Sequence, residues 1–491
     1  SDVYTCDIFT FEFFKKGENA GMGIITCKVN DGNLFDDDGN LRLGRVTLSA
    51  SVSRSKDVEN SSVYKNINFN VKQANKVDVI SVNKTQINLD PYSNNDQVLV
   101  SIFPLEATNK NWNYVFIPAT EGIDESDISI TKIETGLKIE LKNNDVAGKG
   151  TLRLIALDSY STVSDYSTFV DISVNINDGS EAYPYYIKTA DDIEKLVNTN
   201  FEKYYIVSGN FDLSDYDWST VTLSGTIKSE DGKSATFTKE FESCSNTTNE
   251  VYIGLFKEIT GTISGIKLDV SFNLDFSDSE NTGKTIYIGG FAGKNSGIIE
   301  NVSVEIKNGS SISVGNNTLC FGGVVAQNDG TILNNITASS KLTMLVSGKL
   351  EISCISDSII SVGGAVGQNN GTIKRTIEAS LVEFNNSFAT ANVNMTISCD
   401  SVNTQSCVGG IVGSSTNLLS NLESVGTITA SNFDNVGGVV GNNSGTIENC
   451  LSQAVVVGHD NVGGAVGTNS GTISGMIVES LEKKSGVTLI S

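Results

Sequence analysis

A run of acidic and amide side chains near the start of the chain is the stretch best suited to hold a metal ion. It reads N-D-G-N-L-F-D-D-D-G-N, and Asp31, Asp36, Asp38 and Asn40 offer the oxygen ligands that calcium prefers. An EF-hand loop that began at Asp36 would need glycine at its sixth position, where this chain has Leu41. Two interpretations stay open: a calcium site at these four residues, or a solvated hairpin tip. We expect no other cofactor.

Residues suited to catalysis are few. The single histidine, His459, lies in a V-G-H-D-N turn, and one imidazole is too few for a histidine-based triad or a multi-histidine zinc site. We therefore expect His459 to be a solvated turn residue. Glu300 and Glu448 share one repeat position, but Lys374 and Ser474 occupy it in other copies, so this position provides no acid pair on adjacent copies. We predict a protein that is not an enzyme, with a polysaccharide-active β-solenoid enzyme as an alternative.

Charge and cysteine spacing exclude further classes. The 491 residues carry 34 Lys and Arg against 57 Asp and Glu, a net charge of −23 that repels nucleic acid. No apolar run approaches the roughly 18 residues that a membrane span needs. The eight cysteines include no C-x-x-C pair, which argues against structural zinc and a thioredoxin-type site. Cys6 with Cys27, and Cys354 with Cys399, remain possible disulfides.

One glycine-rich unit organises the second half of the chain. It reads V-G-G-V-V-G-N-N-S-G-T-I and returns at the positions Ile288–Ile299, Phe321–Ile332, Val362–Ile373, Val436–Ile447 and Val462–Ile473, with a degenerate copy at Val408–Asn417. The first glycines lie 33, 41, 46, 28 and 26 residues apart, and no helical pattern lies between them. This spacing predicts a β-solenoid with insertions at certain coils. The unit lacks the Lys-Ser/Thr of a phosphate-binding loop.

Each residue type in the unit has an expected place. The paired glycines allow close backbone approach at a corner, and the two apolar residues after them point into the coil. The Asn-x-Gly supplies a turn with positive φ, and its stacked asparagines form a hydrogen-bonded ladder that Ser415 interrupts. Cys320 and Cys407 share one position but are separated by the coil that carries Ser361, so they cannot bridge. Cys450 is expected in the core.

These residues resemble the GLUG motif, whose pattern is v-G-G-l-v-G-x-n-x-G-x-I followed by a strand. The resemblance covers about 240 residues of the chain's second half. It implies an extracellular or cell-surface microbial protein, often adhesin-like, or the non-catalytic stalk of a surface peptidase, although the H-E-x-x-H motif of a peptidase is absent. The implied partners are a host or matrix protein, a glycan, or further copies of the chain, and we expect neither nucleic acid nor a membrane span.

The segment 76–178 resembles a bacterial immunoglobulin-like domain of the group-2 type. Four features follow in the family's order: an opening V-x-x-I-x-V strand, a strand that ends at Pro104, an A-T-N-K turn and Trp112. The family usually continues W-x-S-S-x after the tryptophan, whereas this chain continues N-Y-V-F from Asn113. Trp112 would pack between two sheets. Alternating segments in 1–75 predict another β-sandwich domain.

A short amphipathic helix stands before the repeats. Thr189 is its expected N-cap, Asp192 its third residue, and Ile193, Leu196 and Val197 its apolar stripe, so it would cap the first coil.

The sequence thus predicts an all-β chain: two immunoglobulin-like β-sandwich domains (1–75 and 76–178), a capping segment (179–250), and a right-handed β-solenoid of GLUG-type repeats (251–491). We expect a non-enzymatic adhesin-like or spacer protein, with its recognition surface in the insertions Ser339–Ser358 and Leu381–Ser406. The alternative is a subunit of a filament or surface layer. There the open last coil would accept a strand from another chain, such as Val3–Phe14.

Overall fold

The structure is a computed structural model. It describes residues 77–479, except 108, 120–121, 158–167, 219, 232, 234, 243–247, 279–281, 337–343, 356–357, 378–387 and 401–402, and for residues 1–76 it describes only the backbone of five strands. The calcium-type residues Asp31, Asp36, Asp38 and Asn40, as well as Cys6, lie outside the described residues.

The five N-terminal strands form two small antiparallel sheets. Strands β1 (Asp2–Thr5), β2 (Phe9–Phe13) and β3 (Gly23–Cys27) make one sheet, and β4 (Gly44–Ser53) pairs with β5 (Ser62–Val71). The residues considered above as strand donors, Val3–Phe14, therefore already contain a pair of strands bonded to each other.

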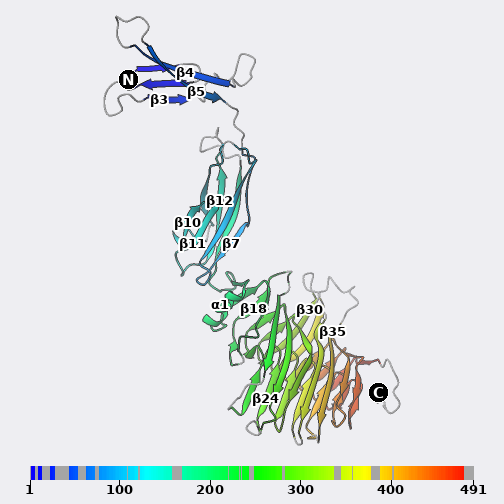
Figure 1. The fold of residues 1–491 in the computed structure, drawn as a ribbon. Helices are drawn as coiled ribbons and strands as arrows, with labels where there is room; N and C mark the ends of the chain where they lie inside the picture. Colours follow the sequence, from blue (N-terminus) through cyan, green and yellow to red (C-terminus); the bar gives the residue numbers. More distant parts are fainter. Residues whose placement is uncertain are drawn as a thin grey trace.

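The next part of the chain is a sandwich of two four-stranded sheets (Figure 1). One sheet has the order β10 (Ile128–Ile133), β11 (Gly136–Leu141), β8 (Asn95–Phe103), β6 (Val79–Val82), and the 3₁₀ helix η1 (Glu125–Asp127) leads into it. The other has the order β7 (Gln86–Leu89), β13 (Phe169–Ile176), β12 (Gly148–Ala156), β9 (Trp112–Pro118). Leu89, Leu152 and Leu137 are fully buried in the core that the sheets share. Trp112 packs against this core but is only partly buried, because β9 is an edge strand.

Four parallel sheets form the rest of the molecule, and one turn of the chain, called a rung below, passes through sheets 1, 2, 3 and 4 in that order. Sheet 1 contains β20 (Glu250–Ile253), β24 (Thr285–Gly289), β28 (Thr318–Gly322), β32 (Ile360–Gly363), β36 (Cys407–Gly409), β41 (Val436–Gly437) and β46 (Val462–Gly463). Sheet 2 contains β17 (Thr222–Leu223), β21 (Phe256–Ile259), β25 (Ala292–Asn295), β29 (Val325–Asn328), β33 (Val366–Asn369), β37 (Val412–Ser415), β42 (Val440–Asn443) and β47 (Val466–Asn469).

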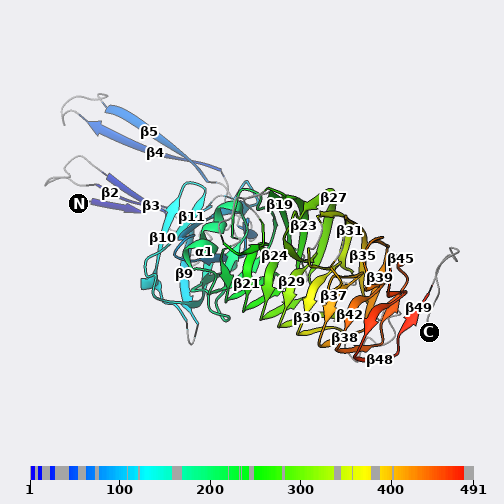
Figure 2. The ribbon, with the colours of Figure 1, turned by 90° about the horizontal axis from the view of Figure 1, so that it is seen from below.

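Sheets 3 and 4 complete each rung. Sheet 3 contains β14 (Tyr185–Ile187), β15 (Tyr204–Val207), β18 (Thr226–Ser229), β22 (Thr262–Ser264), β26 (Ile298–Glu300), β30 (Thr331–Ile336), β34 (Thr372–Ile377), β38 (Leu418–Ser420), β43 (Thr446–Glu448) and β48 (Thr472–Ser474). Sheet 4 contains β16 (Asn210–Asp212), β19 (Ala235–Glu242), β23 (Ile266–Asp275), β27 (Ser303–Ser313), β31 (Met344–Cys354), β35 (Ala389–Cys399), β39 (Leu422–Val425), β40 (Thr427–Thr429), β44 (Leu451–Ser452), β45 (Val455–Val457) and β49 (Ile477–Val478). The predicted β-solenoid is confirmed, and its rungs stack from the sandwich side to the last described strands (Figure 2).

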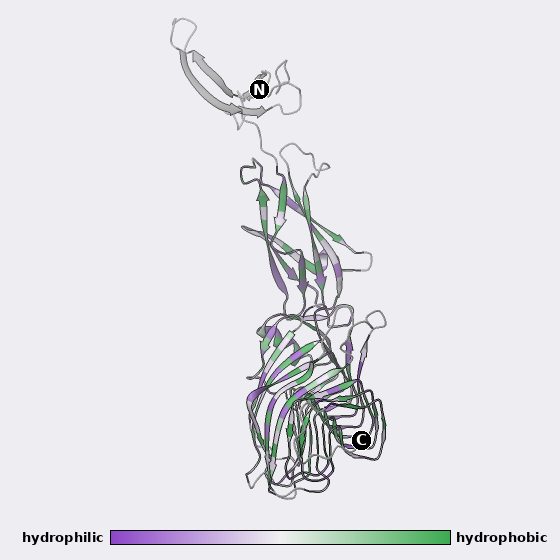
Figure 3. Ribbon diagram, turned by 90° about the vertical axis from the view of Figure 1, so that its right-hand side faces the viewer, coloured by the Kyte–Doolittle hydropathy of each residue, from purple (hydrophilic) through white to green (hydrophobic). Residues whose placement is uncertain are grey.

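The glycine pair lies at the corner between sheets 1 and 2. A Cβ on Gly322 would lie 2.2 Å from the carbonyl oxygen of Val325, so only glycine fits this corner. The next two residues of that rung, Val324 and Val325 after Gly323, are fully buried, as predicted. Buried residues alternate with more exposed ones along β23 (Ile266–Asp275). Figure 3 shows hydrophobic and hydrophilic residues alternating along the solenoid strands.

The Asn-x-Gly turn works differently from the prediction. None of its asparagines or glycines in the described repeats has a positive φ; the glycine is needed because a Cβ on Gly371 would lie 2.0 Å from the Gly330 carbonyl oxygen of the preceding rung. Positive φ occurs one sheet later, where the chain turns from sheet 3 to sheet 4, at Asn301 (50°), Asn421 (57°) and Asn449 (49°).

The insertions begin where this left-handed turn is missing. The equivalent positions in two rungs are Asn334 and Arg375, and β30 and β34 run on past them as strands. Each strand then leads into residues outside the described part, 337–343 and 378–387. The Arg375 side chain is buried, and its Nη1 donates to Asn334 Oδ1 at 3.2 Å and to the Phe388 carbonyl.

The predicted asparagine ladder runs along the axis. Asn295 donates to Asn328 at 2.7 Å, Asn328 to Asn369 at 2.8 Å, and Asn443 to Asn469 at 2.7 Å. Asn369 still donates to the Ser415 hydroxyl at 3.1 Å, but that hydroxyl donates to the Asn417 carbonyl instead of the next rung. The interruption at Ser415 is therefore confirmed.

The cap is a 3₁₀ turn, η2 (Ala190–Asp192), followed by the helix α1 (Ile193–Asn198). The predicted capping contact is present, since Thr189 donates its N–H and its hydroxyl to Asp192 at 2.9 and 3.0 Å. Ile193 and Leu196 enter the solenoid core, but Val197 is 49% exposed, so this part of the predicted stripe is wrong. The helix has only six residues, and its buried face holds Ile193, Leu196 and Lys195; the Lys195 side chain is 3% exposed.

Lys195 joins the cap to the sandwich. Its ammonium nitrogen lies 2.9 Å from Asp90 Oδ2, 2.9 Å from Asp192 Oδ1 and 2.9 Å from the Tyr186 carbonyl. Tyr92 of the sandwich also packs edge-on against Tyr185 of β14. The sandwich and the solenoid therefore meet through a buried, hydrogen-bonded contact.

The cysteines of the solenoid form one disulfide and leave three described thiols free. The disulfide joins Cys354 and Cys399, which face each other on β31 and β35 with a Cα–Cα distance of 4.7 Å. Cys320 and Cys407 are separate buried thiols on either side of the Ser361 rung, and Cys450 is a buried thiol, all as predicted. In the described part of the chain no helix has the length and apolar character of a membrane span.

Candidate functional site

Sheet 4 carries the most distinctive surface of the solenoid. Four of its strands, β23, β27, β31 and β35, have 10 or 11 residues, whereas strands of sheets 1 to 3 have at most six. Strands β31 and β35 lie within the segments Ser339–Ser358 and Leu381–Ser406, which were expected to be irregular insertions. The described part of these segments is instead largely long strands in register with their neighbours.

A hollow of about 330 Å³ lies across the ends of these four strands. Its side chains form two columns that cross the rungs, one of Asn273, Ser311, Glu351 and Thr396 and one of Asp275, Ser313, Ser353 and Ser398. Between the columns lie Leu274, Ile312 and Ile352, whose side chains are buried in the core. We call this surface the sheet-4 groove.

A bulge in β27 bounds the groove on one side. Val270 pairs with Ile306, and the next pair is Asn273 with Ser311. Between these pairs β23 has two residues (271–272) and β27 has four (307–310), so β27 carries two extra residues. Gly309 has φ +90°, and the Ser310 hydroxyl donates to the Lys307 carbonyl and accepts from the Phe272 N–H. Bulges of this kind re-aim side chains beside binding sites. No alternation pattern in the sequence marks it.

Charged side chains beyond the bulge are paired with each other. Lys267 lies 3.1 Å from Asp269 and 3.0 Å from Glu305, and Lys307 lies 3.4 Å from Asp269. This network occupies the half of the sheet face that adjoins sheet 3.

The groove half of the same face has few internal bonds. Glu351 pairs with Lys349 at 3.0 Å, and Asp275 accepts from the hydroxyl and N–H of Ser277, which lowers the pKa of Asp275. The side-chain hydroxyls of Ser311, Ser353 and Thr396 have no hydrogen-bond partner among the described residues, and all three side chains are exposed. The groove is therefore a polar surface on which the hydroxyls of Ser311, Ser353 and Thr396 face solvent, while the Ser398 hydroxyl donates to the Ile352 carbonyl at 3.5 Å.

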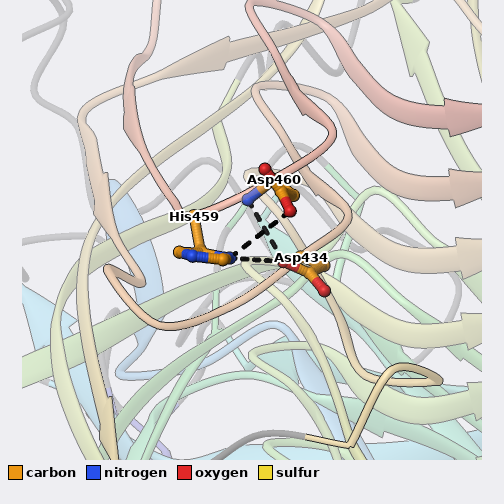
Figure 4. Close-up of side chains that lie close together, drawn as sticks. All are labelled: Asp434, His459 and Asp460. Atoms are coloured by element: carbon orange, nitrogen blue, oxygen red, sulfur yellow. Dashed lines mark hydrogen bonds and ion pairs between the residues drawn. The ribbon is translucent and has the colours of Figure 1, made fainter.

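A second cluster forms where the chain enters sheet 1 in the last two rungs. Asp434 and Asp460 each stand two residues before the paired Val436 and Val462, so they occupy the same position on adjacent rungs. Figure 4 shows His459 beside both carboxylates, with its Nδ1 3.0 Å from Asp434 and 3.7 Å from Asp460. An acid pair on adjacent rungs thus exists, at a repeat position that the sequence alignment of Glu300 and Glu448 did not test.

The chemistry available to this cluster is limited by its exposure. His459 is 66% exposed, and its hydrogen bond to Asp434 raises its pKa. Asp434 also accepts from the Asp460 N–H at 3.1 Å, which orients its carboxylate within the turn. Three ligand atoms lie within 4.8 Å of one another, a spacing that a cation would accept. His459 and the two carboxylates on adjacent rungs therefore form a solvent-accessible polar cluster at this turn.

No family model matches this chain, and no curated protein is detectably similar to it in sequence. Function therefore has to be argued from the groove, the cluster and the arrangement of the domains.

Proposed function

We propose that this chain is a non-enzymatic extracellular or cell-surface protein, in which the sandwich holds a solenoid that presents a binding face. The sheet-4 groove is the observation that carries the proposal. It lies on the four longest strands of the solenoid, next to the two rungs that depart from the regular turn at Asn334 and Arg375. A repeat protein that departs from its pattern at one face places its recognition surface there.

The family assignments belong to the same proposal. We assign the solenoid to the GLUG-type repeats, supported by glycine pairs that turn the same corner in successive rungs and by the asparagine ladder. We assign residues 76–178 to the bacterial immunoglobulin-like domains of the group-2 type, supported by two packed four-stranded sheets. The partly buried Trp112 and the N-Y-V-F sequence after it make this second resemblance incomplete.

The location outside the cell has one structural support. The disulfide between Cys354 and Cys399 joins two rungs, and disulfides persist in oxidising compartments. It lies one residue beyond the paired Ser353 and Ser398 of the groove, so it would hold the groove's strands together after export.

The alternatives have weaker support. An enzyme would need its acids in a site that excludes water, whereas Asp460 is exposed and open to solvent beside His459. For a filament built by strand addition, the candidate donor Val3–Phe14 is less suitable, since its strands β1 and β2 already pair with each other.

The proposal is tested by location and by binding. Antibodies against the solenoid should label intact, unpermeabilised source cells or their medium. The full chain should bind at least one member of a panel of matrix proteins, mucins and polysaccharides without changing it chemically. Labelling only after permeabilisation, or release of product from any panel member, would overturn the proposal.

A further inference from the structure

We propose that the sheet-4 groove binds a neutral polysaccharide, laid along the solenoid axis across the rungs of β23, β27, β31 and β35. This inference rests on the proposed function and names its ligand class. The two side-chain columns of the groove supply its contacts.

The first argument is the chemistry of the columns. The eight outward side chains are four serines, one threonine, one asparagine, one aspartate and one glutamate. Hydroxyl groups both donate and accept, while carboxylates accept up to four hydrogen bonds, often from two neighbouring donors. A surface of this composition matches a ligand that is rich in hydroxyl groups. The Asp275 carboxylate accepts from the N–H and hydroxyl of Ser277, which lowers its pKa and fixes it as an acceptor at the end of its column.

The second argument is the repeat of the surface. Neighbouring strands of a sheet lie about 4.8 Å apart, so each column offers one polar side chain per 4.8 Å over four rungs. This spacing is close to the length of one extended pyranose residue. A polysaccharide along the axis therefore meets a pair of polar side chains at each sugar, and many weak contacts add to one affinity.

The third argument excludes other polymers. The inner groove strands β27 and β31 are paired on both sides across the groove, and the outer strands β23 and β35 pair with β19 and β40 as far as Asn273 and Thr396, so little free edge is left for a peptide to add as a strand. Helical and proline-rich peptides dock in apolar or aromatic grooves, whereas Leu274, Ile312 and Ile352 point into the core. The carboxylates of Asp275 and Glu351, on a chain of net charge −23, repel nucleic acids and acidic polysaccharides.

The β27 bulge forms one boundary of the groove, next to the Ser311 column. Lys307, Asn308 and Gly309 are all exposed on the extra loop of this strand, beside the Ser311 column. Asn308 and Gly309 of this segment lie between the Ser311 column and the ion-pair network of Lys267, Asp269, Glu305 and Lys307. A ligand chain is thereby confined to the polar half of the face.

The experiment uses the full chain and affinity electrophoresis in gels that contain β-glucan, mannan, xylan or, as an acidic comparison, polygalacturonate. The test variant is Ser311→Ala/Ser353→Ala/Thr396→Val, which removes three hydroxyls and keeps strand-compatible shapes. We expect binding to at least one neutral polysaccharide, weakened tenfold or more in this variant, because three hydrogen bonds are lost.

A matched control removes hydroxyls from another outward column. Thr331→Val/Thr372→Val alters neighbouring exposed or half-buried threonines of sheet 3 and should leave binding unchanged. Circular dichroism and melting curves establish that both variants fold.

The possible results separate the groove assignment, the ligand class and the proposed function. Binding to neutral polysaccharide that survives in the folded test variant, or binding to polygalacturonate alone, would overturn the groove assignment. Binding to a matrix protein without any polysaccharide would overturn this inference and leave the proposed display function standing. Chain cleavage, seen as new reducing ends, would overturn the proposed function itself.

Discussion

Lys195 of the capping helix places its ammonium nitrogen 2.9 Å from a carboxylate oxygen of Asp90, although the two residues belong to different domains. Both side chains are almost completely buried, at 3% and 2% exposure. A buried ion pair is costly to form, but removing one partner leaves an uncompensated charge. The junction between sandwich and solenoid is therefore sensitive to single substitutions.

We expect Lys195→Met to destabilise the junction by about 3–5 kcal/mol, because Asp90 and Asp192 lose their shared counter-ion. Urea unfolding followed by fluorescence measures the loss. Lys188→Met is the control: Lys188 is exposed and lies 5.0 Å from the Tyr186 ring, a contact worth about 0.5–1 kcal/mol. Equal losses in both variants would contradict the role given to Lys195.

The same junction should weaken in acid. Burial pushes the pKa of Asp192 up, but hydrogen bonds from the Lys188 N–H and from Lys195 outweigh this and hold it below its ordinary value. A carboxyl group with a lowered folded-state pKa contributes stability above its unfolded pKa, about 3.9, and loses it as pH falls through the folded value. Stability contributed by Asp192 should be complete above about pH 5 and decline below about pH 4.

Asp192→Asn should remove this part of the acid sensitivity, measured as the difference in unfolding midpoint between pH 6 and pH 3. Asp191→Asn, at the exposed neighbouring position, should keep the full difference. Identical pH profiles for Asp192→Asn and the unaltered chain would show that the capping carboxylate does not contribute.

The interrupted asparagine ladder offers a gain of stability. Ser415 is buried and accepts from Asn369 but passes no side-chain bond on to Asn443. Ser415→Asn should restore that bond and stabilise the array by about 1 kcal/mol in denaturant unfolding. Ser431→Asn, an exposed serine in the same rung, should have no effect. A loss of stability in Ser415→Asn would mean that this rung has no room for the longer amide.

Removing the disulfide should destabilise the groove strands. Cys354→Ser/Cys399→Ser is expected to cost about 2–4 kcal/mol, since the bond closes a 45-residue separation. Reductant should lower the melting temperature of the unaltered chain and leave the double variant unchanged. Cys320, Cys407 and Cys450 are buried free thiols, so a reductant has no bond to break at these positions. A reductant effect that persists in the variant would exclude this bond as its cause.

The repeat made the rungs predictable, because every copy obeys the same steric constraints. The glycine corner, the buried pair after it, the ladder with its break at Ser415, and the positions of Cys320 and Cys407 all followed from alignment of the copies. The prediction of positive φ in the Asn-x-Gly turn is wrong, because the glycine of that turn is required by a close contact with the preceding rung and not by its own φ. The sequence of a single repeat does not reveal which of its residues contact the neighbouring rung.

The candidate site was harder to predict. We expect the insertions to be the least regular parts of the array, whereas their described part consists largely of β31 and β35, long strands in register with their neighbours. The bulge at Lys307–Ser310 and the stacked Asp434 and Asp460 depend on register between neighbouring rungs. Lys195 was missed because a lysine in a helix is ordinarily solvated, and only the approach of Asp90 explains its burial.

The cross-rung disulfide also has a mechanical consequence. In a parallel solenoid the backbone hydrogen bonds between rungs point along the axis, so a pull applied at the last rung loads them one rung at a time and peels the array like a zipper. The bond between Cys354 and Cys399 is covalent and cannot yield in this way. When peeling from β49 reaches β35, the load passes through this bond to β31, so the chain between Cys354 and Cys399 cannot be drawn out while the rungs beyond it extend.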